Sequence, residues 1–344
     1  MATTAEVAAM RRALALAASP QVPHGPNPRV GAVLLDPRAG VVGEGYHAGA
    51  GSPHAEVVAL AAAGARAAGA TLVVTLEPCD HTGRTPPCTA AVLAAGVARV
   101  VYAAADAAPP AAGGGARLAA AGVDVESGVL ADEADALNPA FAFSARAARP
   151  YVTWKLAATL DGRVAAPDGT SRWLTGAPAR ADVHRLRASV DAVAVGTGTV
   201  VADDPALTVR GDDGTPASTQ PLRVVIGTRS LPPGARVLDD QAATAVLATR
   251  DVTGALTQLR SQGVRHLLLE GGPTLAGAFV DARAVDRVVA YLAPGLLGAG
   301  SPALARPGVT TLAQTLRLRG GDVASVGDDV RWESYPDYAT PWEV

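Results

Sequence analysis

Four residues in the first third of the chain have the types and order needed for a water-activating zinc site. His54 and Glu56 open a predicted helix, Cys79 follows a predicted strand, and Cys88 begins the next helix. A catalytic zinc ion takes three protein ligands and leaves a fourth position open. A His-x-Glu motif followed by Pro-Cys and a second cysteine is typical of zinc deaminases, in which the glutamate carries protons and is not a ligand. The pattern therefore predicts hydrolytic deamination of a nucleobase.

The spacing of the two cysteines departs from the common deaminase pattern. Eight residues (80–87) separate Cys79 from Cys88, where two are usual. Taken alone, His54 and Glu56 are also typical of a capped, solvated helix start, and the cysteines of core thiols or a disulfide. A position at a helix start would favour the thiolate of Cys88. The combined order and the strand–helix context favour the metal site over these alternatives.

Two glycine-rich segments in the second half are typical of nucleotide binding. GTGTVV (196–201) lacks the third glycine of a dinucleotide fingerprint and is a weak signal. EGGPTLAG (270–277) follows a predicted strand and leads into a predicted helix, so its backbone N–H groups and the helix dipole can hold a phosphate. The same residues also fit an ordinary strand–helix turn. They predict a nucleotide-binding α/β domain, with that alternative left open.

Strands and helices alternate along both halves of the chain. In the first half we expect helices at 4–18, 54–69, 86–96 and 115–121, and strands at 30–36, 41–46, 71–77, 98–104 and 123–126. A helix and a linker over 131–150 precede strands at 151–159, 191–196, 222–226, 245–249, 265–270, 285–293 and 329–335, with helices at 178–189 and 274–282. The stretch 210–221 is predicted to be a flexible loop. Such alternation predicts α/β layers with mostly parallel sheets.

Composition restricts the function further. The 344 residues suffice for two domains, and 49% of them are hydrophobic. The net charge is −3 with no basic tract, which argues against nucleic-acid and membrane-surface binding because both depend on clustered Lys and Arg. We find no signal peptide or membrane span and expect a cytoplasmic protein. In that compartment a pair of cysteines indicates metal binding or catalysis more often than a disulfide.

Longer segments resemble the riboflavin-biosynthesis bifunctional deaminase/reductase family. They are PNPRVGAV (26–33), 43–56, TLEPCDHTGRTPPC (75–88), YVTWKLAATLDGRVA (151–165), SRWLTG (171–176), GTGTVVADDPALTVR (196–210) and EGGPTLAGAF (270–279). The resemblance implies a cytidine-deaminase-like three-layer α/β domain over 1–148 and a dihydrofolate-reductase-like domain over 149–344. The family often has Asp-Pro-Asn-Pro and Ala-Gly-Arg-Gly where this chain has DAAPPAAGGGA (106–116). Substrate contacts of that loop are therefore not carried over.

The resemblance also assigns roles to matching positions of this chain. One zinc ion would be held by His54, Cys79 and Cys88, with Glu56 as the catalytic proton carrier. The deaminase substrate would contact Asn27, His47, His81 and Arg84. The reductase substrate would contact Ser171, Arg187, Leu207, Arg210 and Glu270. NADPH would contact Ala157, Trp173, Thr199, Asp203, Thr228, Gly272, Pro273, Thr274, Leu275, Ala276, Gly277 and Ala278, and Lys155 is a further candidate polar residue of that site.

The implied substrate is a small phosphorylated pyrimidine. Zinc-activated water would deaminate 2,5-diamino-6-(5-phosphoribosylamino)pyrimidin-4-one, and NADPH would then reduce the ribosyl group to ribityl. One alternative is a deaminase of another nucleobase fused to a pteridine-type reductase. A second is a zinc-stabilised scaffold without activity, which the intact Glu56 argues against because a structural zinc site needs no carboxylate beside the metal. We expect a homo-oligomer without nucleic-acid or membrane partners.

Overall fold

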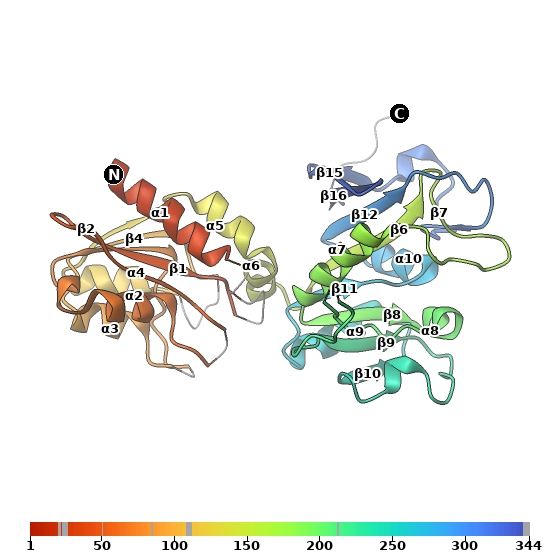
Figure 1. Cartoon of the computed structure of the whole chain (residues 1–344), viewed down its shortest axis with the longest axis horizontal. Coiled ribbons are helices and arrows are strands. Elements are labelled where there is room, and N and C mark those ends of the chain that lie inside the picture. Colours follow the sequence, from red (N-terminus) through yellow and green to blue (C-terminus); the bar gives the residue numbers. More distant parts are fainter. Residues whose placement is uncertain are drawn as a thin grey trace. The chain divides into compact units, whose positions relative to one another are not determined.

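The chain folds into two compact units. The computed structural model describes residues 1–19, 22, 27–49, 51–83, 85–107, 112–211 and 213–339. The units are Met1–Ala148 and Arg149–Val344, and each has its own sheet and core (Figure 1). No helix in these described parts is long and apolar enough to cross a membrane.

The first unit is built on a five-stranded mixed sheet with the order β2-β1-β3-β4-β5. β1 runs antiparallel to β2 and β3, whereas β3, β4 and β5 are parallel. The strands are β1 (Gly31–Asp36), β2 (Gly40–Tyr46), β3 (Thr71–Leu76), β4 (Arg99–Ala104) and β5 (Asp124–Ser127). The helices are α1 (Thr4–Ala17), α2 (Ala55–Ala63), η1 (Gly64–Ala67), α3 (Cys88–Ala94), α4 (Gly114–Ala120), α5 (Ala131–Leu137) and α6 (Pro139–Arg146).

Helices cover both faces of this sheet, which makes the unit a three-layer domain (Figure 1). Successive strand residues point to opposite faces. Val33 and Val73 pack in one cluster with residues of α1 and α5. Leu34 and Leu72 pack in the other cluster with residues of α2, α3 and α4. The predicted three-layer fold is confirmed.

Two glycines of β2 fix the position of α2. A Cβ at Gly43 would lie 2.3 Å from the carbonyl oxygen of Ala59, and one at Gly45 would lie 2.6 Å from that of Ala55. The helix therefore packs directly on the backbone of the strand. This contact sets the place of His54, the N-cap residue of α2.

The second unit contains a nine-stranded sheet. Its main path is β10-β9-β8-β11-β6-β12-β16-β14, and β15 pairs with β16. The six strands from β10 to β12 are parallel, and β16 is antiparallel to β12. The strands are β6 (Tyr151–Thr159), β8 (Ala192–Gly196), β9 (Leu222–Ile226), β10 (Thr244–Leu247), β11 (His266–Leu269), β12 (Arg287–Ala293), β14 (Arg317–Arg319), β15 (Val323–Val326) and β16 (Asp329–Asp337). A separate small ribbon pairs β7 (Arg163–Ala165) with β13 (Ser301–Pro302).

Helices also cover both faces of this second sheet. They are α7 (Ala177–Ala188), α8 (Thr197–Asp203), α9 (Val252–Ser261) and α10 (Pro273–Asp281), with short η2 (Arg236–Leu238) and η3 (Leu312–Gln314). Residues of α9 and α10 pack in one core cluster, and residues of α7 and α8 pack in the other. In such parallel sheets, ligands bind outside the carboxyl ends of the strands.

Several elements of the second unit were not predicted from the sequence. They are β7, α8, η2, α9, β13, η3, β14 and β15. The described residues of segment 210–221 form no helix or strand, which agrees with the predicted loop, and Arg210 and Pro216 form an isolated bridge. The predicted helices and strands are present, with ends that differ by a few residues, but the linker expected before residue 150 contains a second helix, α6.

Candidate functional site

In the first unit, the three predicted zinc ligands come together from three separate segments. The ligand atoms of His54, Cys79 and Cys88 all lie within 4.8 Å of one another. Nδ1 of His54 is 3.1 Å from Sγ of Cys88 and 3.5 Å from Sγ of Cys79. Nε2, the opposite ring nitrogen, is 3.2 Å from Oγ1 of Thr85. The imidazole therefore presents Nδ1 to the thiols, which gives one nitrogen and two sulfur donors, a set that zinc prefers.

The two thiols, both free and buried, divide their charge unequally. A hydrogen bond from Cys88 is the main cause that lowers the pKa of Cys79 to about 4, and His54 adds to it. The interaction between the two thiols, together with burial, raises the pKa of Cys88. The backbone N–H of Cys88 points to Sγ of Cys79 at 3.4 Å. The N–H at this helix start is thus directed to the Cys79 sulfur, and the prediction that the helix start favours the Cys88 thiolate stays a prediction.

Glu56 lies in the first turn of α2 beside this cluster. Its carboxyl group is buried and interacts electrostatically with His54 and the two cysteines, and burial raises its pKa. It is not one of the three clustered ligand residues. Its place next to the cluster suits a proton carrier.

Asn27 and His47, two predicted substrate contacts, form a pair near His54. Nδ1 of His47 is 3.1 Å from the carbonyl oxygen of Pro53, which can only accept a hydrogen bond. Nε2 then accepts from Nδ2 of Asn27 at 2.9 Å. The rings of His47 and His54 meet edge to face with centroids 5.3 Å apart. Burial lowers the pKa of His47, which keeps this ring neutral.

The segment between the cysteines supplies further polar groups. Nδ1 of His81 is buried and has no hydrogen-bond partner among the described residues. A buried polar atom without a partner is a candidate ligand contact. Arg84, also predicted to contact the substrate, lies outside the described residues.

Sequence reasoning missed two residues that organise this site. Thr85 bonds to Nε2 of His54, as described above. Glu77 is buried, and its carboxylate accepts hydrogen bonds from the backbone N–H groups of Asp106, Gly113 and Gly115 at 3.2, 3.2 and 3.0 Å. Both residues belong to the run 75–88 on which the resemblance rests, but their partners are distant in sequence.

In the second unit, the predicted reductase residues line one cavity of about 1140 Å³. A pocket for one drug-sized ligand is typically about 300–1000 Å³, so this cavity can hold two ligands. Predicted residues among its lining are Lys155, Ala157, Ser171, Trp173, Arg187, Thr199, Asp203, Leu207, Arg210, Thr228, Glu270, Gly272, Pro273, Thr274, Leu275 and Ala278.

Ala276 and Gly277 were predicted to contact the cofactor, but they are not among the lining residues. Ala276 is fully buried in the core, and its N–H donates to the carbonyl oxygen of Gly272. A Cβ at Gly277 would lie 2.0 Å from the carbonyl oxygen of Ala305. Both residues are on the inner side of α10, so we correct this part of the prediction.

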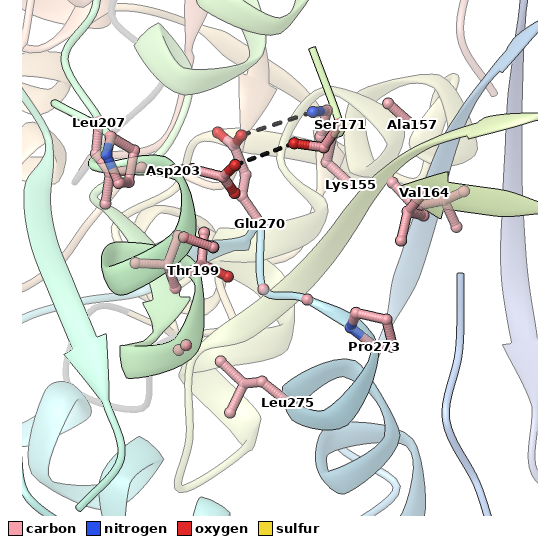
Figure 2. A pocket seen from close by; sticks show the side chains of 18 of the residues that line it. Lys155, Ala157, Val164, Ser171, Thr199, Asp203, Leu207, Glu270, Pro273 and Leu275 are labelled. Atoms are coloured by element: carbon pink, nitrogen blue, oxygen red, sulfur yellow. Dashed lines mark hydrogen bonds and ion pairs between the residues drawn. The ribbon is translucent and has the colours of Figure 1, made fainter. Parts of the chain in front are cut away.

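A buried charged group lies at the cavity wall. Arg187 donates to both carboxylate oxygens of Glu270 at 2.6 and 3.1 Å, and Nζ of Lys155 is 3.7 Å from Oε2. Burial alone would raise the pKa of Glu270, but Arg187 and Lys155 lower it to about 2. Burial lowers the pKa of Lys155. Figure 2 shows Lys155 and Glu270 facing each other, with Ser171 and Asp203 beside them.

The neighbouring side chains complete the cavity. Oγ of Ser171 donates to Asp203 at 3.1 Å (Figure 2). Trp173 is 69% exposed, and the guanidinium of Arg180 lies 4.7 Å from its ring centroid. Thr199 on α8 and Leu275 on α10 flank the loop after Glu270. These groups offer an aromatic surface, a helix start and several cations, which suit a nucleotide and a phosphorylated substrate.

Comparisons with known proteins agree with both units. Residues 150–331 match the RibD C-terminal domain family, and residues 3–104 match the cytidine and deoxycytidylate deaminase zinc-binding region. The riboflavin biosynthesis protein RibD of Mycobacterium tuberculosis is 51% identical over 307 residues, covering 89% of this chain and 90% of the relative. RibD of Escherichia coli K12 is 42% identical over 355 residues, covering 93% and 96%.

Solved structures show the same arrangement of domains along the chain. Acinetobacter baumannii RibD matches with a TM-score of 0.90 and 38% identity, covering 97% of this chain and 99% of that one. A Thermotoga maritima structure, described as a diaminohydroxyphosphoribosylaminopyrimidine deaminase/5-amino-6-(5-phosphoribosylamino)uracil reductase, matches with a TM-score of 0.85 and 31% identity. It covers 97% of this chain and 99% of its own.

The fold and the two sites define an enzyme that joins a zinc-type deaminase domain to a reductase domain. The chain belongs to the RibD family of riboflavin biosynthesis proteins. It is a bifunctional deaminase and reductase, with zinc as the cofactor of the first domain and NADPH as that of the second. The alternative of another nucleobase deaminase fused to a pteridine-type reductase is not favoured.

Proposed function

We propose that the first unit deaminates 2,5-diamino-6-(5-phosphoribosylamino)pyrimidin-4-one and that the second reduces the ribosyl group of the product to ribityl. The two activities named for the Thermotoga maritima relative support both substrates. The observation that carries the deaminase proposal is the buried Glu56 carboxyl beside a His/Cys/Cys cluster to which it does not belong.

We assign the zinc ligands to Nδ1 of His54 and to the sulfurs of Cys79 and Cys88. Three donors fit a catalytic site, which keeps one position for water or substrate. Bound zinc supplies a Lewis acid that activates water at neutral pH. The hydrogen bond that Nε2–H of His54 then donates to Oγ1 of Thr85 supports this assignment, because partners of this kind orient ligating imidazoles.

Glu56 is proposed to move the protons. It takes a proton from the attacking water and returns it to the departing amine, which leaves as ammonia. Asn27, His47 and His81 are proposed to hold the pyrimidine. Nδ1 of His81 is buried and without a partner in the described parts of the chain, which supports a contact to the ring. We keep Arg84 as a proposed substrate contact from the resemblance.

In the reductase cavity, NADPH supplies the hydride. We propose that Ser171, Arg187, Leu207, Arg210 and Glu270 face the substrate, and that Arg210 binds its phosphate, since the guanidinium of Arg187 is already paired with Glu270. Ala157, Trp173, Thr199, Asp203, Thr228 and the loop 272–275 with Ala278 face the cofactor. Gly272 caps the nine-residue helix α10, whose N-terminus suits a pyrophosphate. Lys155 can donate a proton to the ribosyl oxygen as the sugar ring opens.

We further propose that the enzyme acts in the cytoplasm, as a homo-oligomer. Free thiols at Cys79 and Cys88 and the use of NADPH both suit a reducing compartment. The homo-oligomer rests on the resemblance alone. Cell fractionation tests the first statement, and light scattering of the purified protein tests the second.

The Glu56→Gln variant tests the assignment of chemistry to the two units. We expect ammonia release from the diaminopyrimidine to fall at least about a hundredfold, because a general acid–base group contributes that much or more. NADPH oxidation with the deaminated intermediate should stay at the wild-type rate. Ammonia release at the wild-type rate would show that Glu56 is not the proton carrier. Loss of NADPH oxidation with the intermediate would contradict the separation of the two sites.

A further inference from the structure

The reductase cavity has a large excess of positive charge. Its described lining contains Lys155 and only two acidic residues, Asp203 and Glu270. It also contains seven arginines, at positions 172, 180, 187, 210, 229, 236 and 250. Glu270 is already paired with Arg187 and Lys155. Most of the arginine charge is therefore available for anionic ligands.

Two of these arginines leave the same edge of the sheet. Arg229 is the third residue after β9, and Arg250 is the third residue after β10. The two strands are adjacent and parallel, with Ile226 beside Leu247. The N–H of Gly227 donates to the carbonyl oxygen of Leu247 at 3.0 Å, which joins the two loops. The arginines therefore start from neighbouring loops on the ligand-binding side.

Neither of these arginines has a partner among the residues that the structure describes. Arg229 and Arg250 are exposed, and both line the cavity. Within the described ranges, neither guanidinium makes a hydrogen bond or an ion pair, in contrast to Arg187 and Arg172. A guanidinium binds phosphate with two parallel hydrogen bonds when one is offered.

Close contacts connect these loops to the proposed cofactor loop. A Cβ at Gly227 would lie 2.7 Å from Oγ1 of Thr197, and one at Gly272 would lie 3.5 Å from Oγ1 of Thr199. The loop after β9 therefore adjoins α8, and α8 adjoins the loop before α10. In the strand order, β10 stands three places from β11, which is roughly 14 Å at about 4.8 Å per strand. An extended dinucleotide with its nicotinamide near Glu270 can therefore reach the two arginines with its adenosine end.

We propose that Arg229 and Arg250 bind the 2′-phosphate of NADPH and thereby select NADPH over NADH. The two cofactors differ only in this phosphate, and an arginine near the ribose is a general means of accommodating it. The phosphate is a dianion on an exposed end of the ligand, where loop arginines can enclose it. The inference rests on the proposed cofactor site and specifies its adenosine end.

Binding of 2′,5′-ADP and 5′-AMP to the full-length protein, measured by calorimetry, tests the proposal without the reaction. Wild-type protein should bind 2′,5′-ADP more tightly than 5′-AMP. Arg229→Ala and Arg250→Ala should each weaken 2′,5′-ADP binding by about tenfold or more, since each removes a charge-assisted contact, and should change 5′-AMP binding by less than about twofold. Arg185→Ala is the matched control, because Arg185 is exposed in the same unit and is not among the lining residues.

The possible outcomes distinguish a failure of this proposal from a failure of the cofactor site on which it rests. Equal weakening of both nucleotides by the two variants, or no weakening of 2′,5′-ADP, would overturn the role of the arginines. Arg229→Lys and Arg250→Lys should retain part of the preference, and a complete loss in the lysine variants with folded protein would also contradict a charge-based contact. If wild-type protein bound neither nucleotide nor NADPH, the proposed cofactor site itself would be wrong.

Discussion

At the residue scale, the orientation of His54 depends on a side chain that is not a metal ligand. Oγ1 of Thr85 holds Nε2 of His54, which leaves Nδ1 to face the two sulfurs. Loss of such a partner typically weakens metal binding by about 10–100-fold. We expect Thr85→Val to lower zinc affinity within that range, as measured by competition with a chromophoric chelator. Thr85→Ser keeps the hydroxyl and should bind zinc like wild type; equal affinity of the valine variant would contradict the role of Thr85.

The buried carboxyl of Glu270 should make the second unit sensitive to acid. Its pKa is about 2 in the folded protein, against an ordinary value of 4.5. Because the folded pKa is depressed, the stabilisation is complete above pH 4.5 and is lost as the pH falls toward 2. The expected loss is on the order of 3 kcal/mol. Urea unfolding followed by tryptophan fluorescence measures it, since all four tryptophans follow residue 149.

Glu270→Gln provides the comparison for this acid sensitivity. At neutral pH the variant should be less stable by about 3 kcal/mol or more, because Arg187 and Lys155 lose their buried counter-charge. The difference in the free energy of unfolding between the variant and the wild type should shrink as the pH falls. Asp240→Asn, an exposed change in the same unit, should show no such trend. A stability difference for Glu270→Gln that stays constant over this pH range would contradict the account.

The candidate metal ligands could be predicted from the sequence because zinc binds only a few kinds of side chain in proteins. The His54/Cys79/Cys88 cluster is present in the structure, and its assignment to zinc stays a prediction for this chain. Thr85 and Glu77 could not be singled out, since threonine and glutamate are common and their partners are identified only by the folded backbone. The direction of the Cys88 N–H, toward the sulfur of Cys79, could not be predicted for a similar reason.

At the element scale, Glu77 joins the end of β3 to the segment 106–115. Its carboxylate holds three backbone N–H groups of that segment, and a Cβ at Gly114 would lie 1.7 Å from the carbonyl oxygen of Pro78. The close approach explains why this chain has glycine at 114, in a stretch that differs from the usual family sequence. Cys79 is two residues away from Glu77, so the contact also supports the candidate zinc site.

Removal of the Glu77 carboxylate should loosen this segment. In Glu77→Gln, an amide N–H₂ replaces one acceptor oxygen, and part of the backbone hydrogen bonding is lost. We expect amide hydrogen exchange in 112–115 to rise by about tenfold, which corresponds to roughly 1.4 kcal/mol. Mass spectrometry of peptic peptides measures the exchange. Glu133→Gln, an exposed change on α5, is the control, and unchanged protection in Glu77→Gln would contradict the role of this residue.

The alternation of strands and helices was sufficient to predict both α/β units, but not every element. Helix α9 buries Val252, Ala255, Leu256 and Leu259, a helical spacing that was present in the sequence and was overlooked. Strands β14 and β15 are short and depend on pairing with β16, so local patterns cannot reveal them. Helix α8 begins directly after β8, in the glycine-rich segment 196–201, for which no helix was predicted. Which residues of α10 face the core could likewise be determined only from the packed structure.

At the scale of the whole molecule, zinc should stabilise the first unit alone. Binding of a ligand to one folded unit stabilises that unit by mass action. Removal of zinc with a chelator should therefore lower the thermal midpoint of the first unit, as measured by circular dichroism. The tryptophan-monitored transition, which reports only on the second unit, should not move. An equal shift of the tryptophan transition would show that the two units do not unfold independently.

The proposed function requires one chain to perform two reactions in a fixed order at two separate sites. Its most direct test follows ammonia release and NADPH oxidation together in one sample supplied with the diaminopyrimidine, with and without prior zinc removal. With zinc, we predict that ammonia appears first and that NADPH oxidation follows in equal amount. Without zinc, both should stop, while the deaminated intermediate is still reduced by NADPH. Oxidation of NADPH by the diaminopyrimidine without ammonia release would contradict the account.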